Sequence, residues 1–438
     1  MILVIGAGPA GLAAAWAAAR AGHEVRVVER SDHVGGMAAS RTVAGLRVDH
    51  GSHRLHRATD PALLRELRGL LGDDLQTRTR NGRIRVAGRW VGFPLQPADL
   101  LRALPPRFAA GAAVDQLTAP LRRARADTFG EVVRAGLGPT VFDAVYRPFA
   151  RKLWDAHPDE LTGELARRRV SATGPLEVAR RLVRGRQPAG RTFLYPRAGF
   201  GQIPEAVADA AVAAGARLEL RTSVEPAHLD GASAVLSTMP VTSLAAMLGG
   251  PAVELRHRAM VIAWVVLDRP QWTDFDAHYL PDPSHPVARL SEPRNYRESP
   301  DDPPGVTVLC AEIPCWEGDA TWCASPQDLG AVVTDAVARE GLPPIVPVAT
   351  EVARLPRVYP IYRPGFEWEL ARAQAWVASA GCGRIATLGR QGLFVPDNSH
   401  HALAMGRAAA GCLRRDGTLD ADAWTAARAS FRSNVVED

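Results

Sequence analysis

Lysine is almost absent from this sequence. Lysine and arginine together number 52, yet Lys152 is the only lysine in the 438 residues. A GC-rich genome encodes arginine by default and accounts for the arginines, whereas the one retained lysine predicts a position that needs an amine instead of a guanidinium. The net charge of +5 is mild for this length and argues against a nucleic-acid-binding protein.

Cysteine and long hydrophobic runs are also scarce. The five cysteines are odd in number and form no Cys-x-x-Cys pair, which argues against a disulfide framework and predicts a cytoplasmic protein. The gaps between Cys310, Cys315 and Cys323 match no common zinc site, so we expect no metal. The run Ala259–Leu267 is about half of the roughly 18–20 residues that a membrane span needs. The first strand begins at Ile2 with no signal peptide before it, so we expect neither a leader nor a transmembrane segment.

The N-terminus carries the most informative pattern. An apolar strand, Ile2–Ile5, precedes a Gly-x-Gly-x-x-Gly turn at Gly6–Gly11 and an alanine-rich helix, and a second strand, Glu24–Val28, ends at Glu29. This β-α-β arrangement, with an acid after its second strand, is typical of dinucleotide-binding folds. The glycines permit the tight turn, the approach of backbone to a pyrophosphate and close helix packing, and the N-terminus of the helix attracts phosphate. Glu29 suits the hydroxyls of an adenosine ribose.

A second glycine pair distinguishes FAD from NAD. After Glu29 the chain reads Arg30-Ser31-Asp32-His33-Val34-Gly35-Gly36-Met37. This spacing resembles the flavoprotein signature, in which the Gly-Gly pair contacts the diphosphate of FAD, and we therefore expect FAD as the cofactor.

Apolar periodicity divides the remaining chain into elements. It predicts helices at 57–72, 203–214, 326–340 and 400–414, strands at 217–221, 233–237, 348–354 and 384–388, and a strand pair at 83–93. Residues 97–186 read as helical pieces that end at a joint, Gln187–Gly190, and residues 259–312 alternate strands with loops. The arginines at 167–169 are interpreted as part of a solvated basic face, and the alternative is contact with acidic lipid or a nucleotide diphosphate.

These elements predict an α/β fold with a discontinuous Rossmann-like domain beside an α+β substrate domain. We assign residues 1–82, 190–255 and 372–438 to the FAD-binding domain. Residues 83–189 form the helical part of the substrate domain, and residues 256–371 form its sheet part.

Five segments, in order along the chain, carry a family resemblance. They are Val48–His56, Arg147–Trp154, Thr192–Gln202, Ala234–Pro240 and Leu388–Phe394. Together they resemble the FAD-dependent amine-oxidase and protoporphyrinogen-oxidase-like superfamily, and they are similar in part to the flavin-dependent UDP-galactopyranose mutases. The resemblance spans nearly all of the chain and implies an amine-oxidase-like architecture. One departure is His400, which stands where the oxidase-like relatives carry an acid.

The glycine motifs and the resemblance together imply a set of residues that contact FAD. The expected set is Gly6, Gly8, Pro9, Ala10, Gly11, Glu29, Arg30, Gly35, Gly36, Met37, Gly51, Ser52, His53, Val224, Thr238, Gly389, Arg390, Asn398, Ser399 and His401.

The candidate catalytic residues are histidines and the lone lysine. They are His53, His56, Lys152, His400 and His401. An imidazole with a pKa near 6.5 can donate to a flavin carbonyl or carry a substrate proton, and a buried ammonium can bind a phosphate or shift its pKa. The alternatives are histidines at the surface or at helix caps, and a surface lysine beside a packed tryptophan.

Aromatic and basic residues are the candidates for contact with the substrate. They are Trp154, Tyr195, Tyr359, Tyr362 and Arg363. The alternative for the cluster at 359–363 is a structural proline turn with an exposed arginine.

Three hypotheses for function follow. The first is an FAD-dependent oxidoreductase that takes a hydride from a small organic substrate, such as a sugar derivative, an amine or a specialised metabolite, onto flavin N5, with molecular oxygen as a candidate acceptor. The second is a non-redox mutase that uses reduced flavin on a sugar nucleotide. The third is a flavin-binding protein without catalysis. The sequence leaves the substrate and the oligomeric state open.

Overall fold

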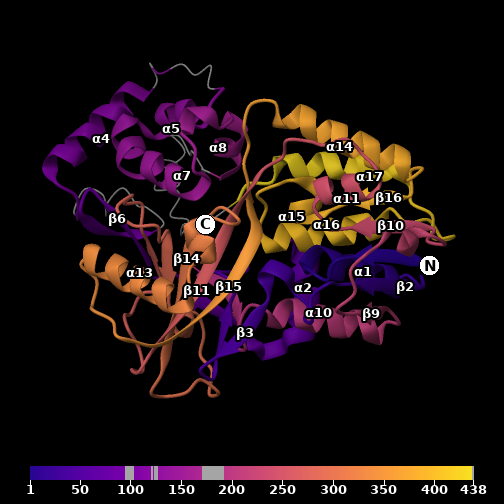
Figure 1. Ribbon diagram of the computed structural model, residues 1–438, viewed down its shortest axis with the longest axis horizontal. Coiled ribbons are helices and arrows are strands. Elements are labelled where there is room, and N and C mark those ends of the chain that lie inside the picture. The colour runs from indigo at the N-terminus through magenta and orange to yellow at the C-terminus, as the bar shows by residue number, and fades with distance from the viewer. Residues whose placement is uncertain (94–102, 120–121, 123–126, 170–191, 437–438) are drawn as a thin grey trace.

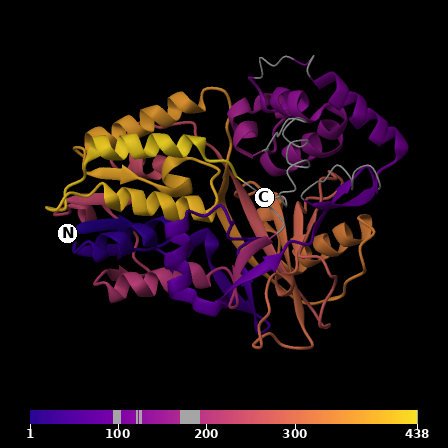
Figure 2. The ribbon, with the colours of Figure 1, turned by 180° about the vertical axis from the view of Figure 1, so that it is seen from behind.

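The computed structural model describes residues 1–93, 103–119, 122, 127–169 and 192–436, and the joint predicted at Gln187–Gly190 lies outside these ranges. The chain forms two lobes (Figure 1). One, the parallel-sheet lobe, contains both the N-terminal β-α-β unit and the C-terminal helices. The other, the mixed-sheet lobe, carries a large sheet with a group of helices at one end, and the view from behind shows the same division (Figure 2).

The parallel-sheet lobe is built on five parallel strands. Their order is β16 (Ile385–Thr387), β10 (Ala234–Ser237), β1 (Ile2–Ile5), β2 (Val25–Val28) and β9 (Arg217–Glu219). Side chains alternate between the two faces of a strand. Ile2 and Val4 therefore pack in one core and Leu3 and Ile5 in another. The sheet is thus covered on both sides, as a parallel sheet requires.

Helices supply the two covers. The first face carries α1 (Pro9–Arg20), α10 (Gln202–Ala213) and α16 (Ser399–Gly411), and the second carries α11 (Val241–Met247) and α14 (Phe366–Ala380). Small residues let α1 and α16 approach closely, because a side chain at Gly406 would meet the backbone oxygen of Ala10 at 2.1 Å. α2 (Pro61–Leu71), α15 (Gly389–Leu393), α17 (Ala421–Ser430) and the short turns η1 (Gly36–Ala38), η2 (Gly72–Asp74), η6 (Pro226–Leu229) and η8 (Phe431–Ser433) complete this lobe.

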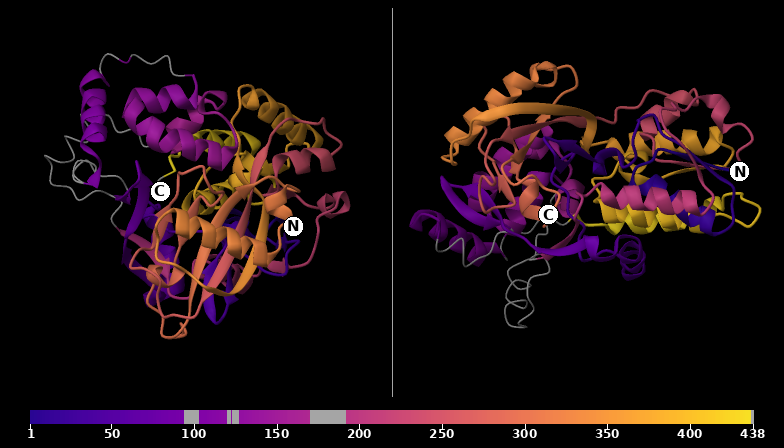
Figure 3. Two further views of the ribbon diagram at one scale, coloured as in Figure 1. Left: turned by 60° about the vertical axis from the view of Figure 1, so that its left-hand side comes forward. Right: turned by 90° about the horizontal axis from the view of Figure 1, so that it is seen from below.

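The mixed-sheet lobe contains a seven-stranded sheet. Its order is β15 (Pro347–Pro360), β11 (His257–Leu267), β14 (Thr307–Cys315), β13 (Arg289–Ser291), β12 (Ala277–Tyr279), β6 (Gly82–Val86) and β7 (Arg89–Phe93). One face of β11 packs under α13 (Pro326–Arg339), and the other meets the hairpin β3 (Ser40–Val43) and β4 (Leu46–Asp49). Figure 3 shows the sheet with α13 lying across it.

Short helices gather at one end of this sheet. They are α4 (Pro106–Thr118), α5 (Phe129–Leu137), α6 (Pro139–Val141), η4 (Phe142–Tyr146), α7 (Arg147–Trp154), η5 (Pro158–Glu160) and α8 (Gly163–Arg169). The remaining elements are η7 (Pro293–Tyr296), α12 (Ala320–Cys323) and the pair β5 (Leu75–Thr79) and β8 (Thr192–Pro196).

The predicted fold class is confirmed, and most predicted elements lie within a few residues of their expected ends. The helix predicted at 57–72 begins only at Pro61, because the Asp60 side chain accepts hydrogen bonds from the amides of Ala62 and Leu63 and so caps the helix there. The strand predicted at 348–354 continues to Pro360 along β11. The domain bounds stay a prediction. Within the described ranges, no helix has the length and apolarity needed to cross a bilayer.

Candidate active site

A cavity of about 780 Å³ lies between the two lobes. Residues that follow the parallel strands line one side of it: Gly6 after β1, Glu29 after β2, Thr238 after β10 and Gly389 after β16. The carboxyl edge of an open parallel sheet is where α/β folds bind ligands. Residues of the large sheet, among them Arg289, Glu312 and Tyr359, line the opposite side.

The turn after β1 forms a glycine cradle. Gly6 has φ +95°, and a side chain there would meet Thr238 Oγ1 at 2.2 Å. A Cβ at Gly8 would meet no protein atom within 4 Å, so this backbone is open to a ligand in the cavity. The Glu29 carboxylate accepts hydrogen bonds from the amides of Ala7 and Ser31, each at 2.8 Å, and fixes the turn beside the strand that follows.

The second glycine pair joins the same cradle. The Gly35 amide donates to the Ala7 oxygen at 2.8 Å, and a Cβ on Gly36 would lie 3.6 Å from the Gly8 Cα. Two glycine loops separated in sequence therefore present backbone side by side. This geometry suits a diphosphate, which needs close backbone approach next to the N-terminus of a helix.

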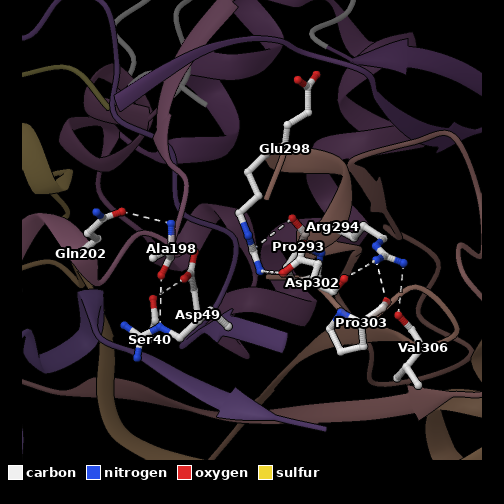
Figure 4. Close-up of polar contacts among 12 residues, drawn as sticks. Ser40, Asp49, Ala198, Gln202, Pro293, Arg294, Glu298, Asp302, Pro303 and Val306 are labelled. Atoms are coloured by element: carbon white, nitrogen blue, oxygen red, sulfur yellow. Dashed lines mark hydrogen bonds and ion pairs between the residues drawn. The ribbon is translucent and has the colours of Figure 1, made fainter. Parts of the chain in front are cut away.

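A buried carboxylate holds the segment that enters the cavity after β4. Asp49 is 1% exposed and accepts from Ser40 Oγ at 2.6 Å, from Tyr195 Oη at 2.6 Å and from the Phe200 amide at 3.0 Å. Figure 4 shows Ser40 beside Asp49, with Gln202 bonded to Ala198 in the adjoining turn. The residues after Asp49, from His50 to Arg54, line the cavity.

The large sheet is hydrogen-bonded to the same segment. The Ser52 amide donates to Glu312 Oε1 at 2.7 Å, and Arg289 binds Glu312 through two contacts of 2.8 and 2.6 Å. The paired carboxylate raises the pKa of the buried Arg289 guanidinium, although burial opposes that rise. Arg289 is therefore a permanent cation in the cavity wall.

Three histidines line the cavity after β4. Burial lowers the pKa of His53, and burial together with neighbouring histidines lowers the pKa of His50 to about 4. Both rings are therefore neutral at pH 7. Both pKa values lie below the value near 6.5 that the sequence alone predicts for these histidines. His53 stacks on Phe200, and its Nδ1 is buried without a hydrogen-bond partner among the described residues, so it can bond to a ligand. The third histidine is His56.

Most residues predicted to contact FAD line this one cavity. They are Gly6, Gly8, Pro9, Ala10, Glu29, Arg30, Gly36, Met37, Gly51, Ser52, His53, Val224, Thr238, Gly389, Arg390, Asn398 and Ser399. Gly11 and Gly35 lie one layer back, where Gly11 packs on the Gly6 backbone and Gly35 bonds to Ala7. His401 caps the first turn of α16, its Nδ1 accepting from the Asn398 amide at 3.3 Å.

Lys152 is not among the lining residues. Its ammonium donates to the backbone oxygens of Leu280 and Val287 at 2.7 and 3.0 Å and so ties α7 to the large sheet. Phe149 and Leu153 of the same helix do line the cavity. A catalytic role for Lys152 stays a prediction, and its contacts supply a structural role.

His400 also lies behind the wall. It is 7% exposed and stacks against His56, with ring centroids 5.8 Å apart, and burial lowers its pKa to about 3. Of the two predicted catalytic histidine pairs, only His53 and His56 reach the cavity.

Tyr359 lines the cavity, whereas the other four predicted substrate residues do not. Trp154 packs on Phe129 in the core, Tyr195 bonds to Asp49, and the Tyr362 hydroxyl donates to the Phe394 oxygen at 2.8 Å. Arg363 is exposed at the surface. None of these four residues therefore lies where it was expected. The three aromatic side chains are buried in cores, because burial of a large apolar ring stabilises the fold, and Arg363 lies at the surface.

The sequence reasoning missed most of the cationic wall. Eight arginines line the cavity, and six of them were not predicted: Arg54, Arg80, Arg169, Arg289, Arg354 and Arg357. Arg169 lies over the rings of Trp154 and Tyr359 at 5.7 and 4.9 Å, and no described carboxylate lies within ion-pair distance of it. No motif marks these residues, because in an arginine-rich chain each one resembles a surface residue.

Comparison with known proteins agrees with this geometry. Residues 4–70 match the model of the NAD(P)-binding Rossmann-like domain. The AofH protein of Mycobacterium tuberculosis, named as a flavin-containing monoamine oxidase, is 29% identical over 257 residues, which cover 54% of this chain and 53% of AofH. The chain thus spans about half the length of the curated relatives it matches.

Solved structures match over nearly all of the chain. A crystal structure of reduced UDP-galactopyranose mutase is 21% identical with a TM-score of 0.79, covering 93% of this chain and 94% of the other. A structure from Exiguobacterium sp. 255-15, named for protoporphyrinogen oxidase, is 20% identical with a TM-score of 0.70, covering 93% and 98%. At these identities the two matches show a shared fold: the chain has the overall fold of these two solved structures.

Proposed function

We propose that this chain is an FAD-dependent oxidoreductase that acts on a small organic substrate. The observation that carries the proposal is that one cavity joins the glycine cradle to a wall of aromatic and basic side chains from the other lobe. Its volume of about 780 Å³ lies within the range of cofactor and ligand sites, roughly 300–1,000 Å³. The name of the relative AofH also supports a flavin.

In this proposal each part of the cavity has a stated task. Gly8 and Gly36 hold the diphosphate by their backbone, and Glu29 faces the ribose. Bound FAD would supply hydride acceptance at N5. His53, neutral and desolvated, donates or accepts a hydrogen bond at the ring system without adding charge.

The charge of the cavity favours a neutral or anionic substrate over a protonated amine. Eight lining arginines face three lining carboxylates, and each carboxylate is already engaged: Glu29 by two amides, Glu312 by Arg289 and Asp397 by Arg168. A cationic substrate would find no free counter-charge among the described lining residues. Arg54 and Arg289 are paired with Asp276 and Glu312, and lining arginines outside such pairs, such as Arg169, would repel the cation.

The visible absorption spectrum tests whether FAD binds, and a substrate screen tests the reaction. The purified chain, reconstituted with FAD, is expected to absorb near 450 nm, and an anaerobic substrate screen is expected to bleach that band. A chain that cannot be reconstituted with FAD would refute the proposal. Benzoate and benzylamine serve as matched probes of charge, and we expect only benzoate to perturb the flavin spectrum.

A flavin-dependent sugar-nucleotide mutase is the second candidate. The observation that favours it is the arginine-rich wall with Tyr359 beside Arg169, which suits a diphosphate next to an aromatic ring. Turnover of a sugar nucleotide only after dithionite reduction, with no net redox change, would establish the mutase and refute the oxidoreductase.

A further inference from the structure

Arg168 is a buried arginine at the end of α8, in contrast to the solvated face expected for this basic run. It is 5% exposed, and its Nη2 donates to Asp397 Oδ1 at 3.2 Å and to the Phe431 oxygen at 2.9 Å. Its Nη1 lies 3.3 Å from the Tyr362 hydroxyl. A guanidinium surrounded by oxygens in this way is an anchor, because removing any one partner leaves a desolvated charge less well compensated.

The last residues of the described chain complete the anchor. The Val436 amide donates to the Arg168 backbone oxygen at 2.7 Å, and Asn434 Nδ2 donates to Asp397 Oδ2 at 2.6 Å. The side chain of Val436 is 2% exposed. The tail, residues 431–436, therefore leaves α17 of the parallel-sheet lobe and docks on α8 of the other lobe, near the centre of the molecule (Figure 1).

Both partners of the tail belong to the cavity wall or adjoin it. Arg169, the next residue after Arg168, lines the cavity from the helical side. Asp397 lines it from the opposite lobe, and its backbone oxygen accepts two contacts from the lining Arg390, at 2.9 and 2.7 Å. One network thus fixes a wall on each side of the same cavity.

We propose that the C-terminal tail, residues 431–436, is a clamp that sets the spacing of these two walls, with Arg168 and Asn434 as its positioning residues. The clamp acts by holding Arg169 and Asp397 at a defined separation. The effect on FAD rests on the function proposed above, whereas the effect on the chain itself does not.

Tail variants of the full chain test the clamp. Asn434→Ala removes the contact to Asp397, Asn434→Asp places a second carboxylate against it, and truncation after Ser433 removes Asn434 and Val436 together. Arg432→Ala is the matched control, because Arg432 lies in the same tail and is exposed. Hydrogen exchange is measured over residues 163–169 and 394–401 without FAD, and the FAD release rate is measured on the reconstituted protein.

We expect faster exchange in both segments and faster FAD release, by about tenfold for Asn434→Ala and more for Asn434→Asp, since a hydrogen bond to a charged group is lost. Arg432→Ala should behave as the wild type. If exchange becomes faster only in the tail itself and FAD release is unchanged, the clamp proposal is refuted and the proposed function is unaffected.

Two further outcomes are also decisive. If the wild type binds no FAD, the proposed function is refuted. The hydrogen-exchange rates of residues 163–169 and 394–401 then test the clamp without FAD. If the truncated chain unfolds, the two Asn434 variants decide, because they alter a single partly buried side chain.

Discussion

Lys152, the one lysine of the chain, has structural contacts that the composition alone does not reveal. Its ammonium satisfies two backbone oxygens of the β12–β13 region from α7. A compact ammonium fits between two carbonyls where a planar guanidinium needs more room. The structure thus gives the retained amine a role in packing between elements, and the need for an amine at this position stays a prediction.

Replacing Lys152 with Met should lower the free energy of unfolding by about 1–3 kcal/mol at pH 7, because both backbone oxygens lose their donor. FAD binding should change little. Denaturant unfolding measures the loss, with Arg151→Met on the exposed side of the same helix as the control. Normal stability with lost turnover would instead support the catalytic role predicted from the sequence.

The pH dependence of this contribution has a defined sign. Burial lowers the pKa of Lys152 to about 8 from 10.5, so the unfolded chain holds the proton more tightly than the folded chain. Stability rises with pH wherever the unfolded state binds more protons. The difference in unfolding free energy, wild type minus Lys152→Met, should therefore increase between pH 8 and pH 10.5, which unfolding curves at several pH values measure. A decrease would contradict the depressed pKa.

A substitution at Gly8 can test the proposed FAD binding separately from folding. A methyl group there meets no protein atom within 4 Å but points into open space at the cradle. Gly8→Ala should leave the melting temperature of the chain without FAD nearly unchanged and weaken FAD binding by at least about tenfold, roughly 1.4 kcal/mol. Fluorescence titration with FAD measures the affinity. Gly69→Ala, equally free of contacts within α2, is the matched control and should bind FAD normally.

At the scale of elements, the crossing of α1 and α16 positions the cradle. α16 begins at Ser399, next to the lining Asn398, and Gly406 brings its backbone against Ala10 in the first turn of α1. The two helices that start at the cavity are therefore in close contact, at the first turn of α1 and about two turns into α16.

Gly406→Ala should separate these helices and destabilise the fold by about 1–3 kcal/mol, since the added methyl would lie 2.1 Å from the Ala10 oxygen. Gly411→Ala in the same helix meets nothing within 4 Å and should be neutral or slightly stabilising. Thermal unfolding of the two variants measures the difference. Equal melting temperatures would show that the helices can relax apart.

At the scale of the whole molecule, the cavity couples the stability of the two lobes when a ligand is bound. Walls from both lobes surround any ligand in it, and β15 extends from the large sheet toward the parallel-sheet lobe (Figure 1). A ligand that bridges both walls stabilises both against unfolding.

FAD at one hundred times its dissociation constant should add about 2.7 kcal/mol of stability. Calorimetry is expected to show both lobes unfolding at a higher temperature. FMN, which lacks the adenylate that the Gly8 and Glu29 region would hold, should stabilise the chain less at the same concentration. A shift of only one of two transitions would show that FAD contacts a single lobe.

The glycine cradle is the part of the candidate site that the sequence predicts best. Its glycines and Glu29 lie within one β-α-β unit, where local spacing dictates geometry, and the strands around them were predicted to within a few residues. The opposite wall of the cavity is predicted poorly. Tyr195 and Tyr362 are of a residue type common in binding sites, yet they are buried in cores. Arg169 and Arg289 are of a type common at surfaces, yet they line the cavity.

The sequence by itself determined the β-α-β unit, the alternation of apolar side chains on its strands and the glycines where backbone must come close. These are properties of neighbouring residues, set by steric limits and by periods of two and about 3.6 residues. Only the tertiary structure decided which side chains share the cavity. Arg168, Asp397 and Asn434 are separated by more than two hundred residues at the extremes, and their contact exists because the packing of the two lobes brings them together.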